Sequence, residues 1–328
     1  MNPPARIAVI GGGAWGTALA NAAALAGREV VLWLRDPAAA ARIAQTRENA
    51  AYLPGVPLHT RVVPTADLGR IAGSDAALLV TPAQTAQAMA EALAGVLPRA
   101  PLVICAKGIE RETGLFLSDA VARVHPGAPV AILSGPSFAH DVARGLPTAV
   151  TLAAHDRELA CDLAAALSGP ALRVYHGTDV RGVEIGGAAK NVLAIACGAV
   201  VGRGLGESAK AALMARGFAE LLRFAAAHGA RPETLMGLSG LGDVVLTCGS
   251  AQSRNFAFGE RIGRGASIDE AAGGKLVEGA ATADALMRLA RERGVDMPIA
   301  EAVQGVLSGR MDLEGAMAAL MSRPLKAE

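Results

Sequence analysis

The sequence has few of the features that mark metal-binding, disulfide-bonded or nucleic-acid-binding proteins. Its four cysteines, Cys105, Cys161, Cys197 and Cys248, are far apart and form no C-x-x-C pair. Neither a metal site nor a disulfide framework is indicated, and a reducing cytoplasm is the expected location. The formal net charge is only +1, which is too small to attract nucleic acid or an anionic membrane surface. We therefore expect small-molecule partners, no nucleic acid and no bound metal.

The sequence also shows no internal repeat, low-complexity linker or signal peptide. Residues 1–4 lead directly into a short apolar run, without the basic region, long apolar region and cleavage site of a secretory signal. The most apolar stretch, residues 184–202, contains Glu184, Lys190 and Asn191. These polar residues favour a buried helix of a soluble protein over a membrane span. No stable membrane insertion is expected.

The order of apolar patterns predicts two domains. The 328 residues are enough for two cores. The first half alternates helical segments with strand-like runs, expected at residues 6–10, 30–34, 76–80, 102–106, 130–133 and 149–152. This alternation predicts an α/β fold with a Rossmann-like, doubly wound, mostly parallel sheet.

From about Thr178 onwards, nearly every segment has helical spacing. Helices are expected at residues 182–202, 207–228, 262–272, 282–293, 298–308 and 312–321. The C-terminal domain should therefore be all-α. The boundary is expected between Thr178 and Gly187, which gives domains of residues 1–182 and 183–328.

A glycine-rich motif follows the first predicted strand. Gly11, Gly13 and Gly16 match G-x-G-x-x-G, a helix-forming segment comes next, and Gly27 is its expected C-cap. Glycines at this spacing permit a tight turn and close approach of the backbone to a pyrophosphate, which the helix N-terminus then faces. The motif predicts a dinucleotide site in residues 1–182. An ordinary glycine-rich turn is the structural alternative.

The residues after the second predicted strand should determine cofactor choice. An acidic side chain there binds a ribose 2′-hydroxyl, whereas arginine accommodates a 2′-phosphate. The chain has both, as Arg35-Asp36. Because Arg35 comes first, NADPH is the expected cofactor, with NADH use possible. Both residues could instead be solvated charges that open the next helix.

Residues 237–255 combine glycines and aliphatic residues with the polar residues Asp243, Thr247, Ser253, Arg254 and Asn255. Polar groups in apolar surroundings need partners, and the arginine with its two polar neighbours can grip a phosphate or carboxylate. An anion pocket is expected here. A polar turn between two helices is the alternative.

Lys190 is the foremost catalytic candidate. The residues one helical turn away, among them Gly186 and Leu193, cannot pair with its charge. Burial of such a lysine is expected to lower its pKa and let it exchange a proton during catalysis. It could instead extend to a domain surface. Asn191 is a weaker candidate, because buried asparagines often serve packing or capping.

Two further candidates follow predicted strands. Lys107 comes after residues 102–106, and Ser137 lies in the segment 134–139 that follows residues 130–133. Ligands of parallel sheets bind beyond the carboxyl ends of the strands, so Lys107, Ser137 and nearby backbone N–H groups could line one cleft. Ser137 could equally belong to a simple turn.

In this order, the segments resemble bacterial-type NAD(P)H-dependent glycerol-3-phosphate dehydrogenases. The resemblance spans nearly the whole chain and rests on residues 11–16, 106–110, 134–139, 188–192, 237–255 and 277–279. It implies reversible reduction of dihydroxyacetone phosphate to sn-glycerol 3-phosphate, a supply of glycerophospholipid backbone, and a homodimer in the cytoplasm. By this resemblance, residues 1–182 bind NAD(P) and residues 183–328 bind the substrate and catalyse.

The resemblance also assigns residues. It implies Lys190 as the proton donor or acceptor. Around the substrate it places Lys107, Gly135, Ser137, Lys190, Asp243, Ser253, Arg254 and Asn255. Near the cofactor it places Gly11, Gly13, Ala14, Trp15, Gly16, Arg35, Lys107, Ala139, Arg254, Leu276 and Glu278.

The chain departs from the family pattern at a few positions. Ala14 stands where serine is frequent, which would remove one hydrogen bond to the pyrophosphate. Leu276 replaces a usual valine, and Ser208 interrupts a Gly-Phe-Gly-x-Asn pattern. These changes bear on cofactor affinity more than on activity.

Two rival functions remain open on the sequence alone. A 3-hydroxyacid or 6-phosphogluconate-type dehydrogenase would share the Rossmann domain, the helices and a catalytic lysine. Arg254 and Asn255 favour a small phosphate monoester over a bare hydroxyacid. A nucleotide-sensing module without turnover is the rival from another class, and the presence of both Lys107 and Lys190 argues against it.

Overall fold

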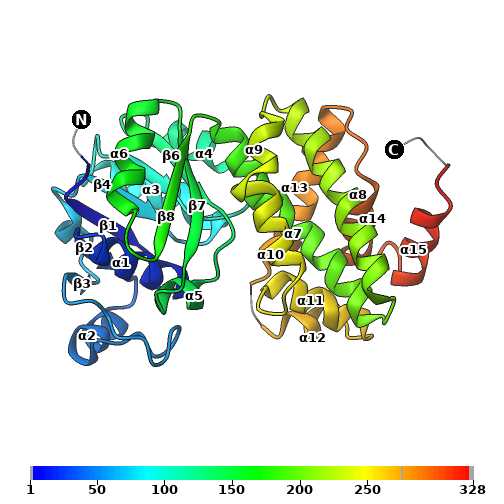
Figure 1. Cartoon of the computed structure of the whole chain (residues 1–328), viewed down its shortest axis with the longest axis horizontal. Coiled ribbons are helices and arrows are strands. Elements are labelled where there is room, and N and C mark those ends of the chain that lie inside the picture. The colour runs from blue at the N-terminus through cyan, green and yellow to red at the C-terminus, as the bar shows by residue number, and fades with distance from the viewer. Residues whose placement is uncertain (1–2, 275, 325–328) are drawn as a thin grey trace. The chain divides into compact units, whose positions relative to one another are not determined.

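The apolar runs of the first half form one eight-stranded sheet in the order β3-β2-β1-β4-β5-β6-β7-β8 (Figure 1). Every neighbouring pair is parallel except β6 with β7. This confirms the expected mostly parallel, doubly wound sheet. The strands are β1 (Arg6–Ile10), β2 (Glu29–Trp33), β3 (Val62–Thr65), β4 (Ala76–Leu79), β5 (Leu102–Ile104), β6 (Val130–Ser134), β7 (Thr148–Ala154) and β8 (Leu172–Gly177).

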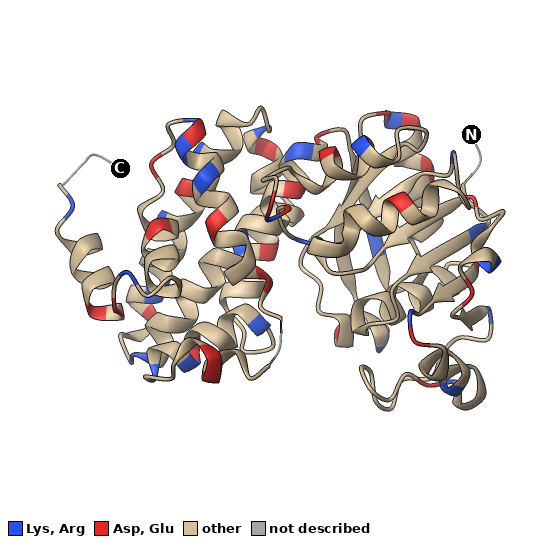
Figure 2. Cartoon of the chain, turned by 180° about the vertical axis from the view of Figure 1, so that it is seen from behind, with Lys and Arg blue, Asp and Glu red and all other residues tan. Residues whose placement is uncertain are grey.

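The computed structural model describes residues 3–274 and 276–324. The chain packs as two units, one of Met1–Lys107 with Leu115–Glu184 and the other of Gly108–Gly114 with Ile185–Glu328. The segment Gly108–Gly114 therefore packs with the helical unit although it comes between two strands of the sheet. Basic and acidic residues are interspersed over both units (Figure 2).

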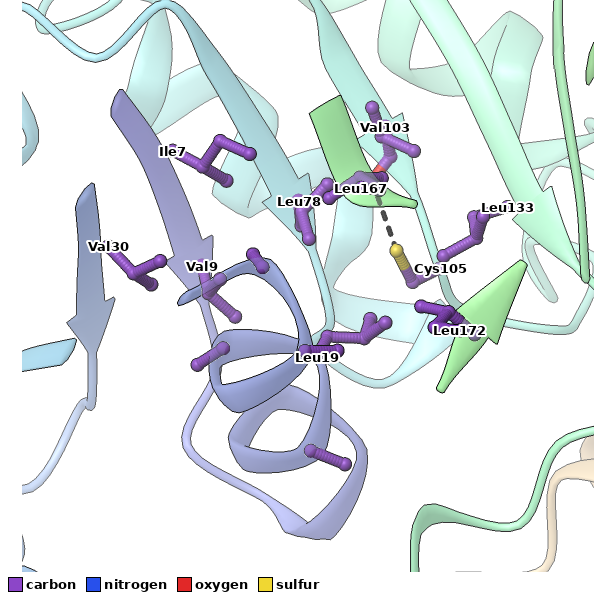
Figure 3. Packing of buried hydrophobic residues seen from close by; sticks show 14 of the residues in the cluster. Ile7, Val9, Leu19, Val30, Leu78, Val103, Cys105, Leu133, Leu167 and Leu172 are labelled. Atoms are coloured by element: carbon purple, nitrogen blue, oxygen red, sulfur yellow. Dashed lines mark hydrogen bonds between the residues drawn. The ribbon is translucent and has the colours of Figure 1, made fainter. Parts of the chain in front are cut away.

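Successive residues of the central strands serve two cores, one on each face of the sheet. On β1, Ile7 and Val9 belong to one apolar cluster and Ala8 and Ile10 to the other. Figure 3 shows the first cluster, in which Leu19 of the following helix lies among strand residues. A strand buried on both faces needs apolar residues at every position, which is why these strands are continuous apolar runs.

Two strands, β3 and β8, were not predicted, and both lie at the sheet edges. Strand β3 has four residues and contains Pro64. Strand β8 alternates buried Leu172 and Val174 with exposed Arg173 and Tyr175. Edge strands need only one apolar face, and their shortness or alternation hides them from a search for apolar runs.

The helices of the first unit cover the two faces of the sheet. The first cluster contains residues of α1, α2, α5 and α6, and the second contains residues of α3, α4 and the start of α7. These helices are α1 (Ala14–Leu25), α2 (Pro37–Thr46), α3 (Ala86–Ala94), α4 (Leu117–Val124), α5 (Ala139–Ala143) and α6 (Arg157–Leu167), with short 3₁₀ turns η1 (Leu68–Ile71) and η2 (Ala83–Thr85).

The described part of the chain after β8 is helical, as expected. It comprises α7 (Val180–Gly202), α8 (Gly206–Ala227), α9 (Pro232–Met236), the π-helical turn η3 (Leu238–Gly242), α10 (Asp243–Cys248), α11 (Arg254–Gly263), α12 (Ile268–Ala272), α13 (Glu278–Glu292), α14 (Pro298–Leu307) and α15 (Leu313–Met321). The single helix expected at residues 262–272 is wrong. Helix α11 ends at Gly263, and Ser267 starts α12 with a capping box to Glu270.

Helix α7 is long and apolar enough to cross a membrane by length and composition. However, 83% of its most apolar window is buried inside the protein. Its composition is therefore that of a central helix surrounded by other elements, in agreement with the sequence-based expectation.

Glycines let α7 and α11 cross backbone to backbone in the second unit. A Cβ on Gly198 would overlap the carbonyl oxygen of Phe256, and one on Gly259 would overlap that of Ile195. Gly202 and Gly263 make equivalent approaches one turn further along each helix. Small residues at this four-residue spacing allow the two helices to approach more closely than ordinary side chains permit.

This crossing predicts a large cost for Gly198→Ala. The added methyl group meets rigid backbone, so we expect a loss of about 1–3 kcal/mol of unfolding free energy. Gly95→Ala is the matched control, since a Cβ there meets no described atom within 4 Å. Urea denaturation of both variants checks the prediction, and equal stability of the two would contradict the close crossing.

Two buried carboxylates tie helices together. Glu220 of α8 is 2% exposed and accepts hydrogen bonds from the N–H groups of Ile299 (2.8 Å) and Ala300 (3.2 Å) at the start of α14. Glu184 accepts from the backbone N–H and the hydroxyl of Ser118 at the start of α4. Burial raises the pKa of each carboxyl group from 4.5 to about 7.

The raised pKa of Glu220 makes its contribution to stability depend on pH. The folded protein keeps this proton up to about pH 7, whereas the unfolded chain releases it near 4.5. Stability contributed by this group is therefore present at low pH and lost as pH rises. The unfolding free energy of wild type relative to Glu220→Gln should fall by on the order of 2 kcal/mol between about pH 5 and about pH 8.

Denaturant titrations of the two proteins at both pH values measure this difference. Burial is the largest cause of the raised pKa of Glu220 and outweighs the hydrogen bonds from Ile299 and Ala300 and the charge of Arg223, while the charge of Asp296 raises the pKa further. A difference that stays constant with pH, or that grows as pH rises, would contradict the raised pKa.

Candidate active site

A glycine loop joins β1 to α1 at the point where the sheet order reverses, between β1 and β4. Gly11 has a φ of +121°, and a Cβ there would lie 2.9 Å from the carbonyl oxygen of Val80. A Cβ on Gly16 would overlap the carbonyl oxygen of Gly11. Both positions therefore require glycine, Gly11 for the turn and Gly16 for the close contact of α1 with the loop.

The loop fits a dinucleotide pyrophosphate. Gly13 is the N-cap of α1, and no side chain caps this helix. A Cβ at Gly13 would meet no described atom within 4 Å. The helix therefore begins at Ala14 and Trp15 with backbone N–H groups that suit an anion. Two buried hydroxyls, Thr81 Oγ1 just after β4 and Ser134 Oγ at the end of β6, have no partner among the described residues, which fits a ligand with polar atoms.

The two charged residues after β2 have different environments. Asp36 is the N-cap of α2, and its carboxylate accepts a hydrogen bond of 2.9 Å from the N–H of Ala38. Arg35 is exposed. The carboxylate is thus used within the protein, while the guanidinium faces solvent. Asp36 does open the next helix, as one of the sequence alternatives proposed.

Lys107 and Ser137 meet at one backbone carbonyl. Lys107 Nζ and Ser137 Oγ each donate to the oxygen of Gly135 at 3.1 Å. Gly135 has a φ of +153°, and a Cβ there would lie 2.8 Å from Cα of Val150. Its glycine identity thus lets the chain turn against β7 after β6. Ala139 begins α5 directly after this segment.

The second unit contains a buried charged cluster around Lys190. Lys190 of α7 is 5% exposed and forms an ion pair with Asp243, which is 1% exposed. Its Nζ also donates to Thr247 Oγ1 at 2.7 Å, and that hydroxyl donates to Asp243 Oδ1 at 3.1 Å. The residues one helical turn away on α7 do not pair with Lys190, and its charged partner Asp243 comes from another helix, α10. Thr247 was noted in the sequence but not assigned to the site.

Close packing of the π-helical turn places Asp243 beside α7. A Cβ on Gly186 would overlap the carbonyl oxygen of Ser239, and a Cβ on Gly240 would overlap that of Leu235. Gly186 lies one helical turn before Lys190, so η3 packs on α7 just below the lysine. Asp243 is the residue that follows η3, which brings its carboxylate to Lys190.

Two buried thiols adjoin this cluster. Cys197 and Cys248 are both 0% exposed. A hydrogen bond with Cys197, together with burial, raises the pKa of Cys248 well above its usual value. The Cys248 thiol therefore stays neutral and adds no charge beside the ion pair.

Ser253, Arg254 and Asn255 lie at the start of α11, but they do not act alike. Ser253 Oγ accepts a hydrogen bond from the N–H of Phe256 as the N-cap, and Asn255 Oδ1 accepts from Gly279 N–H at 2.9 Å. Arg254 is the first residue of the helix and is exposed. An exposed guanidinium at a helix N-terminus suits an anion. The two neighbours are buried and hold the segment in place.

The remaining predicted residues lie near the start of α13. Glu278 is its first residue, and Leu276 is 48% exposed. Asn191 is buried, and its carbonyl oxygen lies 2.6 Å from the position of a Cβ on Gly279. The structure thus groups these residues in the second unit with Asn255 through Gly279.

Two family models match the chain. The model described as "NAD-dependent glycerol-3-phosphate dehydrogenase N-terminus" matches residues 6–160, and the corresponding C-terminus model matches residues 179–318. The glycine loop lies in the first match and the Lys190 cluster in the second.

Individual relatives match 97–100% of the chain. A glycerol-3-phosphate dehydrogenase [NAD(P)+] of Methylobacterium radiotolerans is 62% identical over 100% of this chain and 99% of its own length. A protein of the same name from Azorhizobium caulinodans is 60% identical over 98% of each chain. The crystal structure of a glycerol-3-phosphate dehydrogenase from Coxiella burnetii superposes with a TM-score of 0.92 at 36% identity, covering 97% of this chain and 99% of that one. The chain therefore belongs to the NAD-dependent glycerol-3-phosphate dehydrogenase family.

Proposed function

We propose that the first unit holds the nicotinamide cofactor and that the second unit binds the substrate and supplies the proton. The chain is an NAD(P)-dependent oxidoreductase that catalyses the reversible reduction of dihydroxyacetone phosphate to sn-glycerol 3-phosphate. The main support for assigning these two roles to different units is the buried cluster of Lys190, Asp243 and Thr247. This cluster lies in the second unit, whereas the glycine loop lies in the first.

The first unit would hold the cofactor through backbone and guanidinium groups. The N–H groups at the start of α1 would receive the pyrophosphate, and Arg35 would accommodate the 2′-phosphate of NADPH. Asp36 is used as the cap of α2, which supports a preference for NADPH over NADH. When bound, NAD(P)H supplies the hydride that reduces the substrate carbonyl carbon.

Lys190 would supply the proton. Reduction of the ketone leaves negative charge on the carbonyl oxygen, and this oxygen needs a proton from a group within hydrogen-bond reach. The ion pair with Asp243 and the hydrogen bond to Thr247 fix the direction of the buried Lys190 ammonium group. In the reverse reaction, the neutral amine would take the proton from the substrate hydroxyl.

Positive charge would bind and orient the substrate. Arg254, exposed at the N-terminus of α11, would bind the phosphate, while Ser253 and Asn255 fix the start of that helix and the start of α13. The free energy of phosphate binding offsets the entropy that is lost when the carbonyl is held in one orientation. This raises the rate of the chemical step. Lys107 would add positive charge near the carbonyl oxygen.

Three wider aspects belong to the proposal. The product is a glycerol phosphate, which suits a role in supplying the backbone of glycerophospholipids. The near-neutral charge and four free thiols suit the cytoplasm. A homodimer is proposed by analogy with the family.

The direct test measures the loss of NADPH absorbance with dihydroxyacetone phosphate as substrate. Dihydroxyacetone is the matched control, because it has the same carbonyl and lacks the phosphate. Turnover with the phosphate ester alone supports the proposal. Equal turnover with dihydroxyacetone phosphate and dihydroxyacetone would contradict the proposed phosphate site. Binding of NADPH without turnover of either compound would favour a nucleotide-sensing module.

Removal of the Lys190 ammonium should abolish most of the activity. We expect Lys190→Ala to lower kcat by ~10²–10⁴, the usual contribution of a general acid, with the NADPH dissociation constant changed less than about threefold. The variant also leaves Asp243 buried without its partner, so thermal stability should fall. Steady-state kinetics and NADPH titration separate these effects. A decrease in kcat of less than about threefold would show that Lys190 is not the proton donor.

Arg35 should set the preference between cofactors. Arg35→Ala should raise KM for NADPH by about tenfold or more, because a charge-assisted hydrogen bond contributes about 1.5–3 kcal/mol. KM for NADH should change less than twofold. Asp36→Asn is the control, since asparagine still caps α2 and should leave the ratio of the two KM values unchanged. Equal rises for both cofactors would contradict a 2′-phosphate site.

A further inference from the structure

A buried asparagine outside the glycine motif contacts the middle of the glycine loop. Asn49 is 3% exposed, and its Nδ2 donates to the carbonyl oxygen of Gly12 and to Thr17 Oγ1, each at 2.8 Å. Gly12 lies between the two first glycines of the motif, and Thr17 lies in the first turn of α1. One side chain therefore bonds both the loop and the helix that follows it.

The bond to Gly12 also fixes the neighbouring N–H group. The described residues contain no cis peptide bond, and in a trans peptide the C=O and the N–H point in opposite directions. Holding the Gly12 oxygen toward Asn49 thus directs the Gly13 N–H away from Asn49. Without this bond, the Gly12–Gly13 peptide could rotate and present an oxygen where an anion needs a donor.

Asn49 is itself held by a closed loop of residues 47–58. Leu58 N–H donates to the carbonyl oxygen of Arg47 at 2.7 Å, which closes the loop at its ends. Glu48 Oε1 accepts from Gly55 N–H at 2.7 Å, and the N–H of Leu53 donates to the Asn49 carbonyl oxygen at 2.8 Å. Arg47 reaches the carbonyl of His59 at 2.6 Å. The backbone that carries Asn49 is therefore well ordered by its own hydrogen bonds.

We propose that Asn49 is a positioning residue for cofactor binding, which holds the Gly12–Gly13 peptide so that its N–H faces the pyrophosphate. The inference rests on the proposed function, in which the glycine loop binds NADPH. Asn49 does not touch the cofactor in this proposal. It acts through the backbone, and the ligand group that benefits is the pyrophosphate and not the 2′-phosphate at Arg35.

The chain contains a matched control in Asn21. This asparagine is 6% exposed and joins the same two segments, since its Nδ2 donates to Pro57 O at 3.0 Å and its Oδ1 accepts from His59 N–H at 2.9 Å. It lies on α1 one turn after Thr17 and makes no bond to Gly12. Asn21→Ala thus removes a buried asparagine from the same junction and leaves the Gly12 peptide held.

The experiment compares the affinities of wild type, Asn49→Ala and Asn21→Ala for two probes, by calorimetric titration. NADPH contains the pyrophosphate, and adenosine 2′-monophosphate lacks it. Asn49→Ala should weaken NADPH binding by about tenfold, the loss expected for one positioning hydrogen bond, and change binding of adenosine 2′-monophosphate less than twofold. Asn21→Ala should lower thermal stability and keep both affinities within twofold.

Other outcomes would overturn the inference. Equal weakening of NADPH by both variants, or equal weakening of both probes by Asn49→Ala, would mean that Asn49 only stabilises the fold. Unchanged NADPH affinity of Asn49→Ala would also reject it. If Asn49→Ala does not fold, the near-isosteric Asn49→Asp, which cannot donate to Gly12 O, takes its place with the same two probes. Failure of wild type to bind NADPH would instead reject the proposed function.

Discussion

The buried ammonium group of Lys190 is the constraint on which the second unit depends. A charge that is 95% removed from solvent needs an opposite charge close by. Asp243 and Thr247 meet this need, and both come from a segment about fifty residues further along the chain. Two features bring the Asp243 carboxylate to α7. Gly186 of α7 contacts the backbone of Ser239 closely, and the π-helical turn η3 ends directly before Asp243.

The first unit meets a different requirement. It presents backbone N–H groups, and not charged side chains, to an anion at the start of α1. Its helix α1 begins without a side-chain cap. Gly11 and Gly16 shape the loop because they have no Cβ, and Asn49 shapes it by a hydrogen bond to the Gly12 carbonyl oxygen. Asn49 and Gly11 therefore matter for where backbone groups point. The second unit, in contrast, uses side-chain charges. This difference agrees with the proposal that backbone groups of the first unit bind the pyrophosphate and that Lys190 of the second unit protonates the substrate.

Much of the fold could be predicted because central strands and helices have simple patterns. Strand β1, with a core on both faces, is an uninterrupted apolar run, and the helices α7, α8, α13, α14 and α15 have regular spacing. The short elements α9, η3 and α10 were not predicted, because they span too few residues to show a helical period. The edge strands β3 and β8 escaped prediction since one apolar face is enough for them. The helix predicted at residues 262–272 covered α12 but only the end of α11, and the break between the two was missed although Ser267 and Glu270 have the spacing of a capping box. In the site, glycines and Lys190 could be singled out from sequence, but the pairing of Lys190 with Asp243 depends on tertiary packing. Asn49 carried no sequence signal, because its role comes from a contact with residues more than thirty positions away.

The central claim is that Lys190 and Asp243 act as one unit in catalysis. The most direct test is a double-mutant cycle in which kcat is measured for Lys190→Met, Asp243→Asn and the double variant. Residues that act together are non-additive, so the account predicts that the double variant loses no more activity than Lys190→Met alone. Losses that multiply, or an Asp243→Asn variant with nearly full kcat, would contradict it.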